Sequence, residues 1–235
     1  MMKTHQPVVV IACQVFRELL DSHLPPELRD TVRLLDYGLH ELPKKLRTSV
    51  QETIDLIEQP SLVLLGYGLC GNGLAGIRSR EHTLVIPRAD DCIAILLGSF
   101  QAYKEEFSKE PGTYYLSKGW LESGSDPLSE YHQYIEKYGQ KKADWIMDQQ
   151  YSNYTRLALV AHSKEDLDTY RARAHEVARY CQRWGMRYEE LLGSDLYFQG
   201  LLHAVETLPD GQNEAFLVIP PGKAIEQHHF LQTDH

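Results

Sequence analysis

The stretch PVVVIAC, Pro7–Cys13, is a continuous run of apolar, mostly β-branched residues that ends in a cysteine. Such runs are typical of parallel strands buried on both faces, because a half-exposed strand would alternate apolar and polar side chains. Three later segments are also expected to be strands: Thr31–His40 (TVRLLDYGLH), Ser61–Leu65 (SLVLL) and Thr83–Pro87 (TLVIP).

Helical patterns separate these expected strands. Val15–Leu28 is helical in character until two prolines break it, and Pro43 lies near the first turn of a helix that runs to about Glu58. A further helix is expected over Ile93–Phe107. The repeated strand–helix alternation predicts an α/β fold with a doubly wound, mainly parallel sheet and helices on both faces.

The second half of the chain continues with less regular elements. Expected strands are Thr113–Ser117, Arg156–His162, Met186–Leu192 and Ala215–Pro220, and expected helices are Asp126–Gln150, Lys164–Trp184 after the N-cap Ser163, and Leu196–Glu206. The interpretation is a single α/β domain over residues 1–235. Two α/β lobes remain an alternative, with a metal-site lobe over about 1–125 and a second lobe over about 126–235.

Composition restricts the classes of function. The 235 residues carry a net charge of −9 without a block of basic residues, so nucleic acid is not an expected partner. No apolar stretch approaches the roughly 18 residues of a membrane span, and the N-terminal segment does not resemble a signal peptide. Four cysteines in a chain of this length do not form a disulfide scaffold. We therefore expect a cytoplasmic protein with reduced thiols and no membrane partner.

Three cysteines and a histidine follow the four N-terminal strands: Cys13, His40, Cys70 and Cys92. Ligands of open α/β sheets bind at the carboxyl ends of the strands, so these residues can converge. Thiolate and imidazole are ligands of Zn²⁺ and of iron–sulfur clusters. Cys92 is also expected at a helix N-terminus, which lowers a thiol pKa. Cys181, inside a long helical pattern, is expected only to pack.

A second motif overlaps the cysteine pattern. Gly66–Gly71 (GYGLCG) matches the G-x-G-x-x-G dinucleotide fingerprint, and an acidic pair that includes Asp91 follows about twenty residues later. The motif follows the third strand, and the segment after it is too short and glycine-rich for a good crossover helix. Gly68 and Gly71 are candidate cofactor-binding residues, and a tight turn is the simpler interpretation.

We expect three other side chains to lie near the carboxyl ends of the expected strands. Tyr67 and Asp91 are candidate catalytic residues that orient a substrate, and Trp120 closes an aromatic stretch that could stack on a planar ligand. His228 and His229 are interpreted as part of a solvated tail. A P-loop and a G-x-S-x-G nucleophile elbow are both absent from the sequence.

Several segments together resemble a bacterial and archaeal family catalogued as domain of unknown function 1638. The resemblance is carried by GYGLCGNGLAGI (66–77), PRADDCIAILLGS (87–99) and PGTYYLSKGW (111–120), and also by the Cys13 strand, LHELPKKL around His40 and FLVIPPG (216–222). The family implies no established reaction. The resemblance implies that the protein belongs to a pathway of anaerobes that use corrinoid-dependent methyl transfer. It also supports a functional role for four residues: Cys13, His40, Cys70 and Cys92.

These observations predict a metal site made by Cys13, Cys70 and Cys92, with His40 as a candidate fourth ligand. The hypothesis is a zinc-dependent methyltransferase or a component of corrinoid-dependent one-carbon metabolism, with a small-molecule substrate or a corrinoid protein as partner. One alternative is an iron–sulfur accessory or electron-transfer protein of the same pathway. Another is a nucleotide or metabolite binder that uses the glycine loop.

Overall fold

The computed structural model describes residues 6–207 and 215–230, with side chains for all of these except residues 40, 41 and 204–207. The chain forms two compact units, residues 1–100 with 194–235, and residues 101–193. This division differs from the predicted boundary near residue 125. The chain leaves the first unit and later returns to it, because its last strand pairs with a strand from the N-terminal part.

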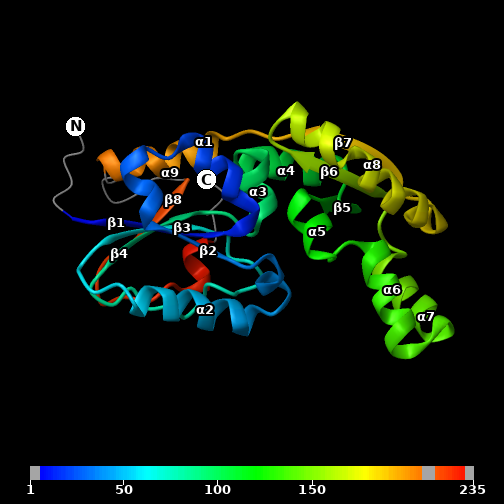
Figure 1. The fold of residues 1–235 in the computed structure, drawn as a ribbon, viewed down its shortest axis with the longest axis horizontal. Coiled ribbons are helices and arrows are strands. Elements are labelled where there is room, and N and C mark those ends of the chain that lie inside the picture. The colour runs from blue at the N-terminus through cyan, green and yellow to red at the C-terminus, as the bar shows by residue number, and fades with distance from the viewer. Residues whose placement is uncertain (1–5, 208–214, 231–235) are drawn as a thin grey trace. The chain divides into compact units, whose positions relative to one another are not determined.

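The first unit contains a five-stranded sheet in the order β2-β1-β3-β4-β8 (Figure 1). The first four strands are parallel, and β8 is antiparallel to β4. The strand bounds are β1 Val8–Cys13, β2 Val32–Leu35, β3 Leu62–Gly66, β4 Thr83–Pro87 and β8 Phe216–Ile219.

The second strand is shorter than the sequence indicated. β2 ends at Leu35, and the 3₁₀ helix η3 (Tyr37–Glu41) follows it. The cause is local, because the Asp36 carboxylate accepts a hydrogen bond of 2.8 Å from the Gly38 N–H and caps the turn. The prediction of a strand that ends at His40 is therefore wrong, since His40 lies within this turn.

Helices cover both faces of this sheet (Figure 1). On one face α1 (Arg17–His23) packs with α9 (Leu196–Thr207), and on the other face α2 (Pro43–Asp55) buries its apolar stripe. The 3₁₀ helix η5 (Gln227–Phe230) also packs on the α2 side. The short elements η1 (Gln14–Phe16), η2 (Pro26–Thr31) and α3 (Cys92–Leu97) complete this unit. The predicted α/β fold with a mainly parallel sheet is confirmed.

Two predicted helices are each divided by a glycine. The segment expected as Ile93–Phe107 forms α3 and α4 (Phe100–Lys109), because Gly98 adopts a left-handed φ of 91°. A side chain at Gly98 would also meet the Ser194 Cβ at 2.5 Å. The segment expected as Asp126–Gln150 forms α6 (Pro127–Tyr138) and α7 (Gln140–Tyr151), which Gly139 separates with a φ of 76°.

The second unit contains a parallel three-stranded sheet in the order β5-β6-β7. As expected, β5 is an edge strand, and Ser163 caps a long helix by accepting a hydrogen bond of 3.0 Å from the Asp166 N–H. The bounds are β5 Thr113–Leu116, α5 Lys118–Ser123, β6 Arg156–Ala161, α8 Lys164–Cys181, η4 Gln182–Trp184 and β7 Arg187–Leu192.

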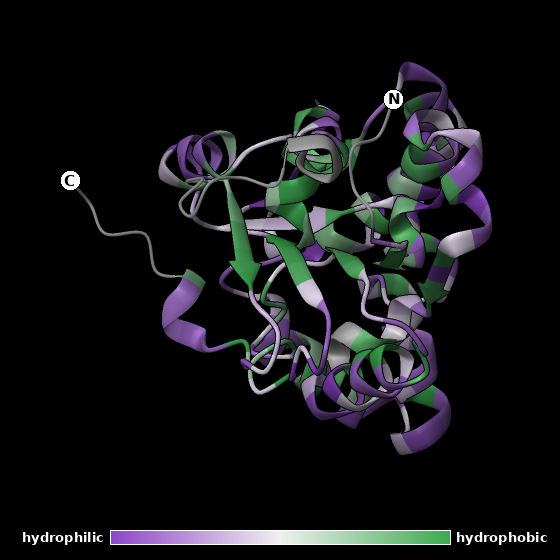
Figure 2. Ribbon diagram, turned by 90° about the vertical axis from the view of Figure 1, so that its left-hand side faces the viewer, coloured by the Kyte–Doolittle hydropathy of each residue, from purple (hydrophilic) through white to green (hydrophobic). Residues whose placement is uncertain are grey.

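The hydropathy of the elements follows this layered plan. Figure 2 shows apolar residues concentrated along the strands, while purple, hydrophilic residues occupy much of the helix surface. Every residue of β3 is buried, as the unbroken apolar run predicts for a central parallel strand. Within the described residues, no helix combines the length and the apolar character needed to cross a membrane.

Candidate functional site

The strand order of the first unit defines a switch point in its sheet. The chain goes from β1 to its neighbour β2 and then crosses over to β3 on the other side of β1. The loops that follow β1 and β3 therefore leave in opposite directions, and such a crevice at the carboxyl ends is where open α/β sheets bind ligands. Cys13 is the last residue of β1, and Tyr67 directly follows β3.

The two loops after β3 and β4 are joined by backbone hydrogen bonds. The Leu69 N–H donates to the Ala89 carbonyl and the Cys70 N–H donates to the Asp90 carbonyl, each at 2.8 Å. Gly68 permits this contact, because a Cβ there would lie 2.7–2.8 Å from backbone atoms of Asp91. Any larger residue at position 68 would push the two loops apart.

The loop also contains three consecutive residues with positive φ. Cys70, Gly71 and Asn72 have φ angles of 48°, 60° and 69°. Glycine adopts this region freely, whereas a cysteine there stores conformational strain. The tertiary contacts of the loop hold Cys70 in this conformation, which determines the direction of its side chain.

The thiols of Cys13, Cys70 and Cys92 interact electrostatically. Burial raises the pKa of Cys13 to about 11 and, with the nearby charges of Asp91 and Cys13, raises the pKa of Cys70 to about 12. Burial, followed by the charges of Cys70, Asp91 and Cys13, also raises the pKa of Cys92 well above its usual range. The expected lowering at a helix N-terminus is thus wrong for Cys92, because desolvation exceeds the effect of the six-residue helix α3.

Backbone hydrogen bonds lower the pKa of each of these three thiols, and at Cys92 the bond comes from its own backbone. The Cys70 sulfur accepts hydrogen bonds from the N–H groups of Gly68 and Cys92, and the Cys13 sulfur accepts one from Val15. These bonds favour the thiolate and oppose the effect of burial. The site thus combines partial burial of Cys13 and Cys92 and deeper burial of Cys70, which disfavour an uncompensated thiolate, with donors that stabilise a charged sulfur.

Tyr67 contributes an unusual buried hydroxyl to this region. Its side chain is 3% exposed, and its hydroxyl has no hydrogen-bond partner among the described residues. Burial and then the charges of Cys13, Cys70 and Asp36 raise its pKa. An unmade hydrogen bond of this kind costs roughly 1–3 kcal/mol, so the Tyr67 hydroxyl is available to a polar atom of a ligand.

Asp91 has a structural role that accounts for its position. It is the N-cap of α3, and its carboxylate accepts hydrogen bonds from the N–H groups of Ile93 at 2.8 Å and Ala94 at 3.4 Å. Burial raises its pKa in spite of these two bonds. Its charge also raises the thiol pKa values of Cys70 and Cys92, so Asp91 lies within the thiol group.

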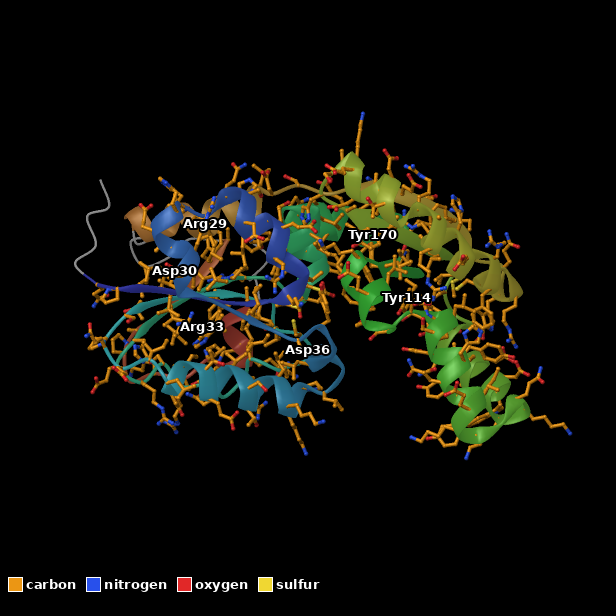
Figure 3. All side chains as sticks on the ribbon, in the orientation of Figure 1. Arg29, Asp30, Arg33, Asp36, Tyr114 and Tyr170 are labelled. Atoms are coloured by element: carbon orange, nitrogen blue, oxygen red, sulfur yellow. The ribbon has the colours of Figure 1, made fainter. Side chains whose placement is uncertain are left out.

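Sequence reasoning did not identify Asp36, which lies at the end of β2 (Figure 3). Its negative charge contributes to the raised pKa values of Cys13 and Tyr67. The sequence signal was the Asp36–Gly38 capping turn, which ends the strand before His40. Recognising that turn would have placed an acidic side chain beside the cysteines.

The other residues singled out in the sequence contribute no side chain that the structure shows beside the three thiols. The His40 side chain lies outside the described residues. Trp120 belongs to α5 of the second unit and packs against the core of that unit. A side chain added at Gly71 would have its Cβ 3.6 Å from the Pro43 ring. Cys181 is 0% exposed in the second core, as expected for a packing residue.

A different group of potential metal ligands lies at and just before η5. Among the side chains that the structure describes, Glu226, His228 and His229 form a group of three with ligand atoms all within 4.8 Å of one another. Cys13, Cys70 and Cys92 do not form a group as compact as this. Both histidines belong to η5, whose Phe230 packs on the first unit, so they do not lie in a loose tail, whereas the expected exposure to solvent holds for His228.

Of three comparisons with known proteins, one identifies a family, and it is the family that the sequence motifs resemble. No curated protein and no solved structure matches the chain. One family model matches residues 34–201, a range that includes His40, the glycine loop, Cys92 and Trp120 but not the Cys13 strand or the FLVIPPG segment. Since this range is most of the chain, the protein belongs to the family described as "Protein of unknown function (DUF1638)".

Proposed function

We propose that the carboxyl edge of the first sheet binds a soft metal centre through Cys13, Cys70 and Cys92. The observation that supports the proposal is that Cys13, Cys70 and Cys92 lie at the carboxyl ends of three neighbouring strands, β1, β3 and β4, and that the charge of Cys13 raises the pKa of both Cys70 and Cys92. His40 is retained as a candidate fourth ligand.

The chemistry of the surroundings supports a cation at this place. Buried thiols without a cation stay protonated, whereas metal ligation requires the thiolate. The N–H donors to the sulfur atoms of Cys13 and Cys70 favour that charged form. Hydrogen bonds to ligating sulfur atoms are also a common feature of metal–thiolate centres.

The reaction that we propose is methyl transfer to a substrate thiol. Zinc with an exchangeable position would keep such a thiol deprotonated at neutral pH, which makes it a nucleophile. The Tyr67 hydroxyl is available to orient the substrate, and a corrinoid protein is the proposed methyl donor. We place the protein in the cytoplasm, where a reducing environment keeps the four free cysteines as thiols.

Metal analysis of protein purified without oxygen or chelator tests the proposal. We expect about one zinc per chain, or several irons with broad visible absorbance for the iron–sulfur alternative. Cys70→Ser and Cys92→Ser should each remove most of this metal, because a hydroxyl is a poor replacement for a soft thiolate. The control Cys181→Ser changes a fully buried thiol of the second unit and should retain the metal.

Two results would contradict the metal proposal. One is fully stable wild-type protein that contains neither zinc nor iron. The other is a Cys70→Ser variant with its metal content unchanged. In the first case, a thermal-shift screen of the metal-free protein with nucleotides would test the glycine-loop alternative.

A further inference from the structure

The turn Glu226–His229 is held at both ends by the core of the first unit. Ile225 is 0% exposed, its N–H donates to the Ile77 carbonyl and its carbonyl accepts from the Gly76 N–H, both at 2.8 Å. Phe230, after the turn, is 4% exposed and belongs to the same apolar cluster. The backbone of the turn is therefore constrained at both of its ends.

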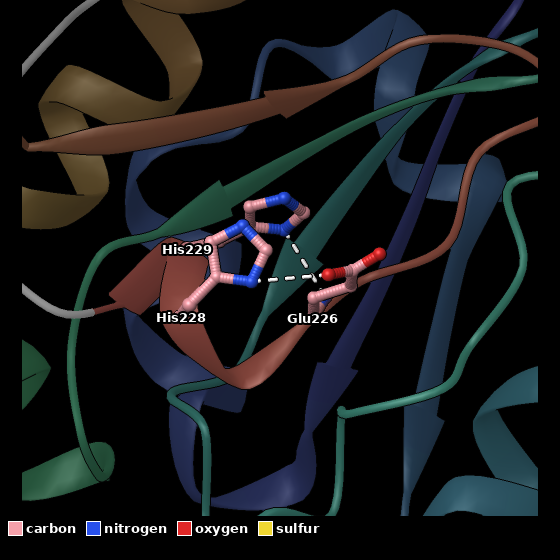
Figure 4. A group of neighbouring side chains, drawn as sticks. All are labelled: Glu226, His228 and His229. Carbon is pink, nitrogen blue, oxygen red and sulfur yellow. Dashed lines mark hydrogen bonds and ion pairs between the residues drawn. The ribbon is translucent and has the colours of Figure 1, made fainter.

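Three of these side chains face one another in Figure 4. His228 Nδ1 lies 3.0 Å from Glu226 Oε2, and the Glu226 N–H donates to His229 Nδ1, also at 3.0 Å. One ligand atom from each of the three residues lies within 4.8 Å of the other two. The side chains of Glu226 and His228 are 61% and 65% exposed, so an ion can reach them from solvent.

We propose that Glu226, His228 and His229 bind a divalent transition-metal ion. Two imidazoles and one carboxylate are borderline donors, which suit Zn²⁺, Ni²⁺ or Cu²⁺ better than Ca²⁺ or Mg²⁺. Three protein ligands leave at least one position for water or for a donor atom of another molecule. This site is distinct from the thiol group in ligand chemistry, and the inference does not rest on the proposed function.

Local contacts limit the affinity of this site. An ion must replace the His228–Glu226 ion pair and the hydrogen bond from the Glu226 N–H to the His229 ring. The positive charge of Arg88 also acts on His229. We therefore expect affinity below that of a closed four-ligand structural site, and selectivity for metals that bind imidazole strongly.

The test is calorimetric titration of the full chain, without a histidine tag, with Zn²⁺. The double variant His228→Gln/His229→Gln and the single variant Glu226→Gln should each bind this zinc on the order of tenfold or more weakly. His132→Gln removes an exposed histidine elsewhere and should bind as the wild type does. Circular dichroism of each variant checks that the fold is retained.

Titration with Co²⁺ separates the two metal proposals. A thiol site gives intense sulfur-to-cobalt charge-transfer absorption, which Cys70→Ser should remove. The Glu226 group should bind a second equivalent without that absorption, and this binding should persist in Cys70→Ser. The inference is overturned if the double histidine variant binds Zn²⁺ like the wild type, or if all binding disappears with Cys70→Ser in a folded protein.

Discussion

Tyr67 and its two thiol neighbours, Cys13 and Cys70, differ in how well their polar atoms are satisfied. Sulfur tolerates a dry environment, and the sulfur atoms of Cys13 and Cys70 also receive backbone N–H groups. The Tyr67 hydroxyl has no such partner among the described residues. The hydroxyl therefore destabilises the free protein, and a bound ligand would offset this cost by forming the missing hydrogen bond.

Tyr67→Phe tests this interpretation. Removing an unpartnered buried hydroxyl should leave stability unchanged or raise it by about 1 kcal/mol, because no hydrogen bond is lost. Chemical denaturation of the metal-free protein measures this difference. A loss of more than about 1 kcal/mol would mean that the hydroxyl already has a partner, such as ordered water.

Asp91→Asn separates the charge of this side chain from its capping role. The amide oxygen can still cap α3, but the negative charge that raises the pKa of Cys70 and Cys92 is removed. The thiol pKa values of the metal-free protein should therefore fall. The pH dependence of alkylation measures them, and an unchanged profile would place Asp91 too far from the thiols to act on them.

The loop between β3 and β4 shows how local sequence and tertiary contact combine at the level of an element. Its glycines have separate tasks that the G-x-G-x-x-G pattern does not distinguish. Gly68 lies against the backbone of Asp91, while a Cβ at Gly71 would make only an ordinary van der Waals contact with Pro43, and Gly71 has a φ of 60°. In a dinucleotide-binding loop, such a glycine lets the backbone approach the pyrophosphate. In this protein Gly68 instead lets the loop approach the backbone of Asp91.

Gly68→Ala and Gly71→Ala should therefore have different effects. A Cβ at Gly68 would clash with backbone at 2.7–2.8 Å, so we expect a loss of about 2–3 kcal/mol and reduced metal content. Gly71→Ala is a matched control that should cost about 1–2 kcal/mol through its left-handed φ alone. Denaturation and metal analysis measure both. Equal losses with normal metal content would show that the two loops adjust freely.

Arg156 stabilises the sheet of the second unit from a buried position. Its guanidinium donates to Thr113 Oγ1 at 2.7 Å and forms ion pairs with Glu189 at 2.9 Å and Glu106 at 3.1 Å. Arg156 comes from β6, and the hydroxyl and the Glu189 carboxylate come from β5 and β7. The residue thus joins all three strands.

Arg156→Met should destabilise the second unit by about 2–3 kcal/mol. This is below the roughly 3–5 kcal/mol of a fully buried pair, because the two carboxylates that lose their partner are partly exposed. Native-state hydrogen exchange should show the effect in β5, β6 and β7. Metal content should not change, and a loss of metal in this variant would contradict the assignment of the site to the first unit.

At the scale of the whole molecule, the buried thiols link stability to pH. In the unfolded chain a thiol ionises near its usual value of 9.0, whereas Cys13 and Cys70 in the folded protein keep their protons to about 11 and 12. Below pH 9 both states are protonated and these groups add no pH dependence. Between about pH 9 and 11 the unfolded state is stabilised by losing protons, so the free energy of unfolding falls.

Denaturant titrations of the metal-free protein from pH 7 to about 11 measure this fall. Cys13→Ser should reduce the slope above pH 9, and metal should reverse the trend, because binding thiolates releases protons and becomes tighter as pH rises. A slope that is identical in wild type and Cys13→Ser would show that the Cys13 thiol is not held protonated by burial.

Much of the architecture was predictable because the signals are local. The run Pro7–Cys13 indicated a buried parallel strand, TLVIP formed β4 with the predicted bounds, and Ser163 caps α8. The boundary errors came from turn chemistry with a weaker signal than hydrophobic periodicity. The Asp36 turn shortened β2, and Gly98 and Gly139 divided helices whose apolar pattern continues across them.

The sequence alone determined the fold class, the family motifs and the position of three cysteines after strands, because these depend on residue types and on spacing along the chain. Tertiary structure decided the order of the strands and the return of β8 to pair with β4. It also decided the environment of each thiol, where burial outweighs the helix terminus at Cys92, and it placed Glu226, His228 and His229 on a constrained turn. The physical reason is that desolvation and proximity depend on every element packed around a group, and these neighbours come from distant parts of the chain.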